Sequence, residues 1–434
     1  MKGDYRRFLY SLLKIGSIGF GGGSALIPVI EQEIVTKHGL DTKKNIDKDV
    51  IVASITPGAL PVEIVASIGR RKFGNRGMIA AAVMMALPGA LITILMMTLL
   101  SVFQEKLLPV IEIASVGISL FIIYLLVNYM VSTIKVCYKE SRGRGRKAVF
   151  IIAVVFLLVC GKNIYKLFGI SRVPVFGLST VQILALAFFC MFYSRSNYNV
   201  RNVMVMLGLG GMYLLGSGRA QVLSVPGLLE AVKIAMSVLA VWGVRQNIKE
   251  KKWRYEGEVR KIFSEFWIWL LLILATGVIL VAINPGALVF LGKGSLSALL
   301  SFGGGDAYLT IADGLFVESG MITEQQYYGQ IVPIVNILPG SILCKTLVAV
   351  GYEIGFNEAG SVAMGLTFAV AGFISSIAVS CGFFMLIYRL YDSLQTLWAF
   401  RMVSRWIRPI LSGLLLNIIL SLVNQGIRVV TTFI

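Results

Sequence analysis

Two stretches of this chain carry the same helix-breaking residues in the same order and at the same spacing. Phe20-Gly21-Gly22-Gly23 recurs as Phe302-Gly303-Gly304-Gly305, Pro57-Gly58 recurs as Pro339-Gly340, and Gly69 recurs as Gly351. Each pair is separated by 282 residues (339 − 57, for example). Further matches at this offset are Ala25/Ala307, Val35/Val317, Ile55/Ile337 and Asn75/Asn357. The chain is therefore predicted to contain one module twice, each copy with interrupted helices.

The breaks lie in a chain with the composition of a membrane protein. Of its 434 residues 57% are hydrophobic and only 14% are charged, whereas a soluble domain carries roughly 25% charged residues. Several almost uncharged segments reach the roughly 20 residues that cross a bilayer. We therefore expect an all-α, polytopic protein in the lipid bilayer. The segments are 78–100, 111–134, 148–160, 176–193, 203–218, 226–244, 264–282, 360–388 and 410–431.

The formal net charge of +18 does not indicate a nucleic-acid partner, because the cations gather in loops between apolar segments. One cluster runs from Lys135 to Lys147 and another from Arg245 to Lys261. Positive charge on cytoplasmic loops accounts for both clusters.

The sequence contains few features that would indicate an enzyme. Five cysteines without paired spacing and a single histidine predict neither a disulfide framework nor a metal site. There is no phosphate-binding loop of the ATPase type, and Gly208-Leu209-Gly210-Gly211 has no βαβ context. We expect no catalytic residues and no cofactor.

Charge placement also predicts how the two copies are oriented. With both basic loops in the cytoplasm, 78–100 leaves the cytoplasm and its counterpart 360–382 enters it. The two copies are therefore expected to be inverted-topology repeats with broken or re-entrant helices. The predicted organisation is a first repeat in 1–140, intervening spans with a basic cytoplasmic loop in 141–262, and a second repeat in 263–434.

Each copy is expected to supply two helix N-termini next to unwound backbone. In the first copy Ser24 is a predicted N-cap for a helix over 25–36, followed by a polar turn from Thr36 to Asp49. A new helix is expected near Ala59, after Pro57-Gly58. In the second copy Asp306 is the predicted N-cap, and Pro339-Gly340-Ser341 opens the next half-helix. Helix N-termini suit anions, although the glycines could instead serve helix packing.

Two charges fall inside apolar runs at equivalent positions, Glu63 and Lys345. An isolated charge in a membrane is costly, so we expect these two to pair across the repeat interface. The alternative is that both reach water at opposite faces. For Asp306, the alternative to the N-cap is a role in binding a proton or the substrate. The predicted substrate-binding set is Gly21, Gly22, Gly23, Ser24, Pro57, Gly58, Glu63, Gly303, Gly304, Gly305, Asp306, Pro339, Gly340, Ser341 and Lys345.

These motifs resemble a known family. Phe20 to Pro28, the Glu31-x-Glu33 pair, Pro57-Gly58 and Gly69 look like a chromate transporter domain, and Phe302–Gly305, Pro339-Gly340 and Gly351 look like a second one. The resemblance covers about 5–100 and 290–385. It implies the long-chain form of the family, a carrier of a divalent oxyanion in the bacterial plasma membrane, typically for chromate efflux, with sulfate as an analogue. The family usually has Pro-Gly-Pro where each copy of this chain has its Pro-Gly break. The third residue is Ala59 in the first copy and Ser341 in the second.

The resulting expectation is a secondary transporter of an inorganic oxyanion that works by alternating access, and a homodimer is left open. The alternatives are an ion-coupled carrier of sulfate, an organic acid or a cation, acting through Glu63 or Asp306, and a membrane scaffold. Arg70, Arg71 and Lys72 either anchor the cytoplasmic face or attract anions to it.

Overall fold

The computed structural model describes residues 2–19, 26–170, 177–194, 200–217, 227–250, 259–302 and 305–433. These ranges are helical and hold no strand. Six helices within them are long and apolar enough to cross a membrane. A seventh crossing results if α6 (Arg142–Val159) and α7 (Gly161–Leu167), bent by 64°, are one span. The chain is thus an all-α, multi-pass membrane protein, as its apolar segments predict.

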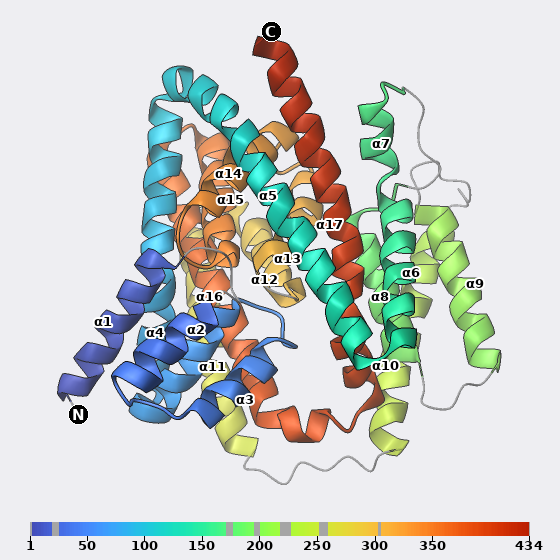
Figure 1. Ribbon diagram of the computed structural model, residues 1–434, viewed down its shortest axis with the longest axis horizontal. Coiled ribbons are helices and arrows are strands. Elements are labelled where there is room, and N and C mark those ends of the chain that lie inside the picture. The colour runs from blue at the N-terminus through green and yellow to red at the C-terminus, as the bar shows by residue number, and fades with distance from the viewer. Residues whose placement is uncertain are drawn as a thin grey trace. The chain divides into compact units, whose positions relative to one another are not determined.

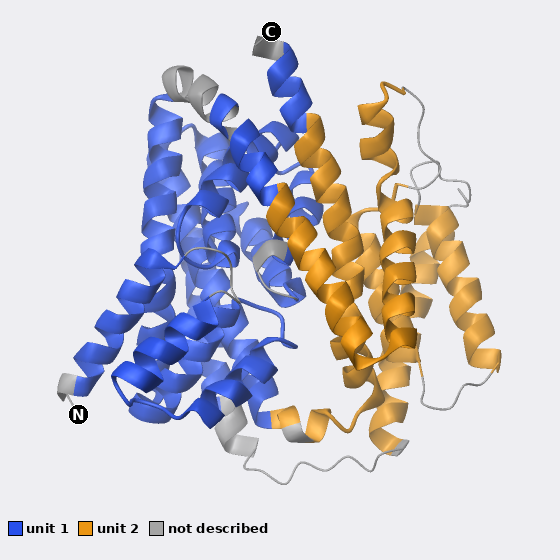
Figure 2. Ribbon diagram, in the orientation of Figure 1, with its two compact units in different colours: residues 1–122, 258–389, 425–434 blue, residues 123–257, 390–424 orange. Residues whose placement is uncertain are grey.

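The chain forms two compact units, which Figure 2 distinguishes by colour. Unit 1 comprises 1–122, 258–389 and 425–434, and unit 2 comprises 123–257 and 390–424. Both sets of helix-breaking landmarks belong to unit 1. The three-part division drawn from the sequence follows the repeats, not these units, and stays a prediction.

In unit 1 the same order of elements occurs twice along the chain (Figure 1). Between the two sets lies α11 (Val259–Ile283). The first set is α1 (Lys2–Ile18), α2 (Leu26–Glu31), the π-helical η1 (Gln32–Lys37), α3 (Lys43–Ala53) and α4 (Leu60–Val102). The second set is α12 (Ala287–Leu300), α13 (Gly305–Ala312), η2 (Asp313–Val317), η3 (Gln325–Ile331) with α14 (Val332–Ile337), α15 (Ile342–Ala359) and α16 (Val362–Leu394).

One predicted element of the first copy is wrong. The polar turn expected from Thr36 to Asp49 ends earlier, because α3 begins at Lys43. The side chain of Thr42 accepts a hydrogen bond from the backbone N–H of Asn45 and so caps this helix. The half-helices after the two Pro-Gly breaks begin where the sequence predicts, at Leu60 and at Ile342.

Each copy then folds into a helical hairpin, but the turn lies at a different place. In α4 the turn is Gly74, with φ 70° and ψ −158°, which divides the helix into a first arm (60–73) and a second arm (75–102). In the second copy Gly360, with φ 60°, separates α15 from α16. Glycine adopts such left-handed conformations at little cost.

Gly69 and Gly351, the glycine landmarks of the two first arms, show how the sequence offset between the copies changes in the second arms. A side chain on Gly69 would meet the backbone of Gly77, whereas one on Gly351 would meet Phe368. The offset therefore grows from 282 before the turn to 291 after it (368 − 77). The match of Asn75 with Asn357 is consequently wrong, since Asn75 follows its turn and Asn357 precedes its own. For the same reason the counterpart of 78–100 is 369–391, and not 360–382.

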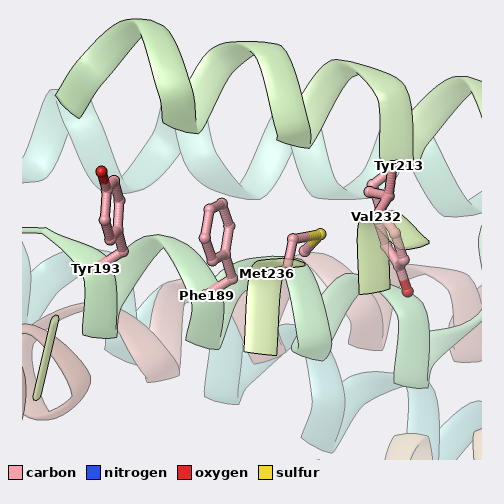
Figure 3. Close-up of a cluster of buried hydrophobic side chains, with 5 residues drawn as sticks. All are labelled: Phe189, Tyr193, Tyr213, Val232 and Met236. Carbon is pink, nitrogen blue, oxygen red and sulfur yellow. The ribbon is translucent and has the colours of Figure 1, made fainter. Parts of the chain in front are cut away.

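Unit 2 has its own apolar core, drawn in Figure 3. Phe189 and Tyr193 of α8 (Thr180–Tyr193) stack with ring centroids 5.7 Å apart. Tyr213 of α9 (Val200–Ser217) and Met236 of α10 (Leu228–Glu250) complete the cluster with Val232. The N-terminus of α8 is fixed by a capping box between Ser179 and Gln182.

Two long helices, α5 (Gln104–Glu140) and α17 (Trp398–Phe433), contribute to both units. In unit 2 the amide of Asn163 on α7 donates to the side chains of Asn417 and Ser421 on α17. Large apolar side chains are exposed on several helices, including Leu120 of α5 at 67% and Val278 of α11 at 71%. A lipid environment explains such exposure, which water would penalise.

Candidate functional site

Each Pro-Gly break donates one backbone hydrogen bond to the other repeat. The N–H of Gly58 donates to the carbonyl of Ser301 at 2.9 Å, and the N–H of Gly340 donates to the carbonyl of Gly19 at 2.8 Å. Gly58 and Gly340 are equivalent, and so are Gly19 and Ser301 (301 − 19 = 282). Reciprocal contacts of this kind are the signature of a two-fold relationship. Each break is therefore completed by the other copy, at the end of the helix that leads into its glycine-rich segment.

The backbone at both breaks takes conformations that favour glycine. Gly58 has φ 143° and Gly340 has φ 96°. A side chain on Gly58 would collide with Oε1 of Glu63, and one on Gly89 of the second arm would lie 2.6 Å from the carbonyl oxygen of Pro339. The breaks thus bring backbone close to the other repeat, as irregular backbone inside a membrane protein requires.

The departure from Pro-Gly-Pro at the first break has a structural counterpart. Alanine at position 59 leaves a backbone N–H that a proline would lack. This N–H donates to Oγ of Ser380 on α16, at 3.2 Å. The extra donor is therefore paired, again with the other copy.

Glu63 and Lys345 are both buried, with exposures of 0% and 2%. Oε2 of Glu63 accepts a hydrogen bond from the hydroxyl of Thr56 at 3.5 Å. The ammonium of Lys345 donates to the carbonyl oxygen of Leu338. Thr56 and Leu338 are themselves equivalent (338 − 56 = 282), so each charge reaches back to the residue before its own break. The predicted Glu63–Lys345 pair stays a prediction.

The two half-helices that start at the breaks differ in charge. Glu63 lies in the first turn of α4, where a negative charge complements the N-terminal dipole. The first turn of α15 contains no acid, and the position equivalent to Glu63 is the positively charged Lys345. The dipole and the ammonium therefore add at the second break, which suits an anion better than the first.

Several predicted site residues lie outside the described residues. These are Gly21, Gly22, Gly23, Ser24, Gly303 and Gly304. Gly305 is the first residue of α13, and Asp306 follows it inside the helix. Ser341 precedes α15 with extended backbone and makes no side-chain capping bond. Glu63 lies against Gly58, and Gly89 of α4 lies next to Pro339, Gly340 and Lys345.

Sequence reasoning missed two buried ion-pair networks in unit 1. Glu265 of α11, 1% exposed, accepts from Arg70 at 2.8 Å and from Arg389 at 2.7 Å. Arg71 donates to Asp41 at 2.7 Å and to Asp49 at 2.6 Å. The sequence signal was present, since Glu265 is an acid at the start of an otherwise apolar span.

The two acids on Arg71 respond differently to their surroundings. Burial raises the pKa of Asp41, but hydrogen bonds from Asn45 and Arg71 outweigh it, and the net pKa is lowered. Burial dominates at Asp49 and raises its pKa. Arg70 and Arg71 are thus engaged in structural ion pairs. Glu31 and Glu33 pair with lysines at 2.7 and 2.9 Å, Lys43 and Lys37 respectively.

Unit 2 contains an apolar cavity of about 470 Å³. Its walls include Val155, Leu186, Met206 and Trp406, and no charged side chain lines it. A cavity of this kind cannot compensate the charge of an oxyanion. The polar, interrupted backbone of unit 1 is the better candidate site.

Interrupted helices inside a multi-pass membrane protein are a common feature of secondary transporters. The chain belongs to the chromate transporter family, whose sequence profile, described as "Chromate transporter", matches residues 6–215 and 294–434. Two matched regions agree with the long-chain form with two such domains.

Three curated relatives carry transporter names. The chain is 30% identical to the uncharacterized transporter YwrB of Bacillus subtilis over 87 residues, 20% of this chain and 44% of that protein. It is 27% identical to the uncharacterized transporter YwrA of the same organism over 95 residues, 22% and 52% of the two chains.

The third relative is the uncharacterized transporter MJ0718 of Methanocaldococcus jannaschii, 30% identical over 149 residues, 34% of this chain and 36% of that protein. The matches span about half the length of the two Bacillus relatives, or less. No solved structure matches the chain.

Proposed function

We propose that this protein is a secondary transporter of an inorganic oxyanion, with chromate as the substrate, moved outward, and sulfate as a second ligand. The observation that carries the proposal is the pair of backbone hydrogen bonds by which each Pro-Gly break contacts the other repeat, Gly58 to Ser301 and Gly340 to Gly19. It gathers unwound backbone, two helix N-termini and a buried lysine in one region of unit 1. Backbone N–H groups, helix dipoles and a fixed cation are the means by which proteins hold oxyanions.

We propose that the substrate binds at the second break, beside Lys345. A divalent oxyanion there would face the start of α15 and the ammonium that now contacts the carbonyl of Leu338. That carbonyl is a weak partner compared with a dianion, so substrate would draw the ammonium away from it. Glycine at positions 89 and 340 keeps side chains out of this region.

Transport is proposed to occur by rocking one repeat against the other, with the repeats inverted in the membrane. In Figure 1 the second arm of α4 ascends from blue to cyan, while its counterpart α16 descends from orange to red. Antiparallel counterparts and reciprocal contacts support inverted-topology repeats. The exchanged hydrogen bonds would be the contacts that rearrange.

The alternative, an ion-coupled carrier of another solute, is favoured by one observation, the buried carboxyl group of Glu63. An acid of this kind would suit a cation or a proton and would repel an anion at the first break. Both proposals use the same region, and flux measurements separate them.

The experiment uses the purified full-length protein in liposomes with trapped, radiolabelled chromate or sulfate. Wild-type protein should release chromate, and unlabelled sulfate should compete. Lys345→Gln should lower flux by about tenfold or more, because it removes a fixed cation worth several kcal/mol to a buried anion. Lys233→Gln, an exposed α10 residue paired with Glu230, is the matched control and should leave flux unchanged.

The proposal fails if wild-type vesicles release neither chromate nor sulfate faster than protein-free vesicles. Flux of an organic acid or a metal cation, with no flux of the two oxyanions, would instead establish the alternative.

A further inference from the structure

Glu63 is a buried acid of unit 1 whose carboxyl group is poorly satisfied by its surroundings. The residue is 0% exposed, and its Oε2 has one long hydrogen bond, 3.5 Å from the Thr56 hydroxyl. Within the described part of the chain, Oε1 accepts no hydrogen bond. An ionised carboxylate in such surroundings is costly, because it has lost water and gained little in exchange.

Other buried acids of unit 1 show what full compensation looks like. Asp49 is also 0% exposed, and it receives hydrogen bonds from Arg71 and Ser67. Glu265 receives two arginines. These acids are paired with hydrogen-bonded arginines, and Glu63 has no comparable hydrogen-bonded cation in the described ranges. The contrast indicates that Glu63 is not a structural ion-pair residue.

The neighbours of Glu63 are small polar groups, mostly from the other repeat. Its Oε1 lies against Gly58, whose N–H is bonded to Ser301, and Ser380 is next to Gly58 as well. The hydroxyl of Ser301, a residue 1% exposed, is likewise without a hydrogen-bond partner among the described residues. Two residues with unsatisfied buried groups, Glu63 and Ser301, therefore both contact Gly58, and unsatisfied buried groups of this kind point to a ligand or a proton.

The titratable groups that face Glu63 come from two elements. The thiols of Cys344 on α15 and Cys381 on α16 both interact electrostatically with its carboxyl group. Lys345, next to Cys344, is the charged neighbour on α15 and also acts on that thiol. Thr56 precedes the first break, Ser301 follows α12 and Ser380 lies on α16; none of these three titrates near neutral pH.

We propose that Glu63 is the proton-binding group that couples anion movement to proton movement. The proposal rests on the transport function proposed above and adds the identity of the coupled ion. Oε1 takes a proton from water on one side of the membrane and releases it to water on the other, so one O–H bond forms and later breaks. In the enclosed arrangement seen here the carboxyl group is neutral, which removes the cost of its burial.

The location of Glu63 explains how proton binding follows the transport cycle. Rocking one repeat against the other separates Gly58 from Ser301, and water then reaches the carboxyl group. Access changes from one side to the other in the same step that moves the substrate site beside Lys345. Neutral Glu63 also removes a negative charge from the region of the anion, so anion affinity and protonation are linked.

The test combines two assays on proteoliposomes with Glu63→Gln. Net sulfate flux driven by a pH gradient, read with a trapped pH-sensitive dye, should fall to the level of protein-free vesicles. Exchange of labelled for unlabelled sulfate at equal pH, which needs no net proton transfer, should stay within about threefold of wild type, since glutamine imitates the neutral acid. The sign of the dye signal gives the direction of the proton relative to the anion.

Two further variants make the result specific. Glu63→Asp keeps a carboxyl group and should restore part of the dye signal. Glu358→Gln removes an exposed acid of α15 that contacts Asn284, and both assays should give wild-type values. In direct binding, wild-type sulfate affinity should change by up to about tenfold per pH unit, and in Glu63→Gln it should not depend on pH.

Three outcomes would overturn the inference. Wild-type protein that moves sulfate without any proton signal, or Glu63→Gln that keeps the full signal, leaves the transport function intact and removes the coupling role. Loss of exchange together with net flux in a Glu63→Gln protein that is monodisperse and melts normally would assign Glu63 to substrate binding. Wild-type vesicles that transport neither chromate nor sulfate would end both proposals.

Discussion

The two repeats of unit 1 have the same backbone interruptions and opposite charges. Glu63 in the first copy corresponds to Lys345 in the second, and Arg71 corresponds to Glu353 (353 − 71 = 282). Arg71 reaches back to Asp41 and Asp49 beside and within α3, and Glu353 accepts a hydrogen bond from Gln326 of η3, the counterpart of α3. The same contact between elements is therefore made by an ion-pair network in one copy and by a neutral donor in the other.

The comparison shows which properties the duplicated module must keep and which it can change. The hydrogen bonds at Gly58 and Gly340 involve backbone only, so they survive any exchange of side chains that leaves the glycines. The side chains around them have diverged, and the region between the repeats has one acidic and one basic half. The duplicated backbone plan is thereby combined with an asymmetric distribution of charge.

The largest effect is expected from filling the breaks themselves. Gly58→Val and Gly340→Val should each abolish anion flux, because a side chain collides with Glu63 in the first case and is strained by a positive φ in the second. Flux in proteoliposomes is the measurement. Gly117→Ala, at an exposed position of α5 with open space around it, should behave like wild type. Unequal loss at the two breaks would show that they are not equivalent in transport.

Breaking the Arg71 network should have the next largest effect. Arg71→Gln leaves Asp41 and Asp49 buried without their cation, which should cost about 3–5 kcal/mol of stability. Glu353→Gln should cost only about 1 kcal/mol, because only hydrogen bonds with the neutral side chains of Gln326 and Asn357 are altered. Thermal unfolding in detergent compares the two variants. Equal destabilisation would contradict the view that the copies are stabilised differently.

A smaller effect is expected from Ser380→Ala. This change removes the hydroxyl that accepts the N–H of Ala59, so a buried donor is left unpaired at a cost of about 1–3 kcal/mol. Ser375→Ala on the same helix is the matched control, since this equally buried hydroxyl donates to the carbonyl of Gly372 within that helix. A double variant with Ala59→Pro, which deletes the N–H, should recover part of the lost stability if proline is tolerated there.

The smallest effect concerns acid stability. Since the pKa of Asp41 in the folded protein lies below its ordinary value of 3.8, its ionised form stabilises the fold above that value. This contribution is lost as the pH falls through the folded pKa. Asp41→Asn should therefore be less stable than wild type at neutral pH and show a shallower loss below pH 4. Identical acid limbs in the two proteins would refute the assignment.

Several helix boundaries could be predicted from the sequence, because glycine and proline mark the interruptions directly. The starts of α4 and α15 follow from Pro57-Gly58 and Pro339-Gly340. The start of α3 did not, because the cap at Thr42 lies in a polar stretch that also reads as a turn. The longer second hairpin was hidden as well, since no landmark after Gly351 marks the turn at Gly360.

The candidate site was less predictable than the fold. Buried charges at positions 63 and 345 stand out in apolar runs, but their hydrogen-bond partners depend on side-chain directions that spacing does not give. The pairing of Gly58 with Ser301 joins residues 243 positions apart (301 − 58), and only the folded backbone reveals it. Glu265 shows the same limit, because its two arginines come from distant helices.

The exchanged hydrogen bonds also impose an order on biosynthesis. The amide of Gly58 enters the membrane long before Ser301 has been translated, a delay of about 12–50 s at typical ribosome speeds. A backbone group that waits in lipid without a partner is costly. The nascent first half must therefore keep this segment near water or shielded by the insertion machinery, and a chain truncated before residue 301 should be a substrate for membrane proteases.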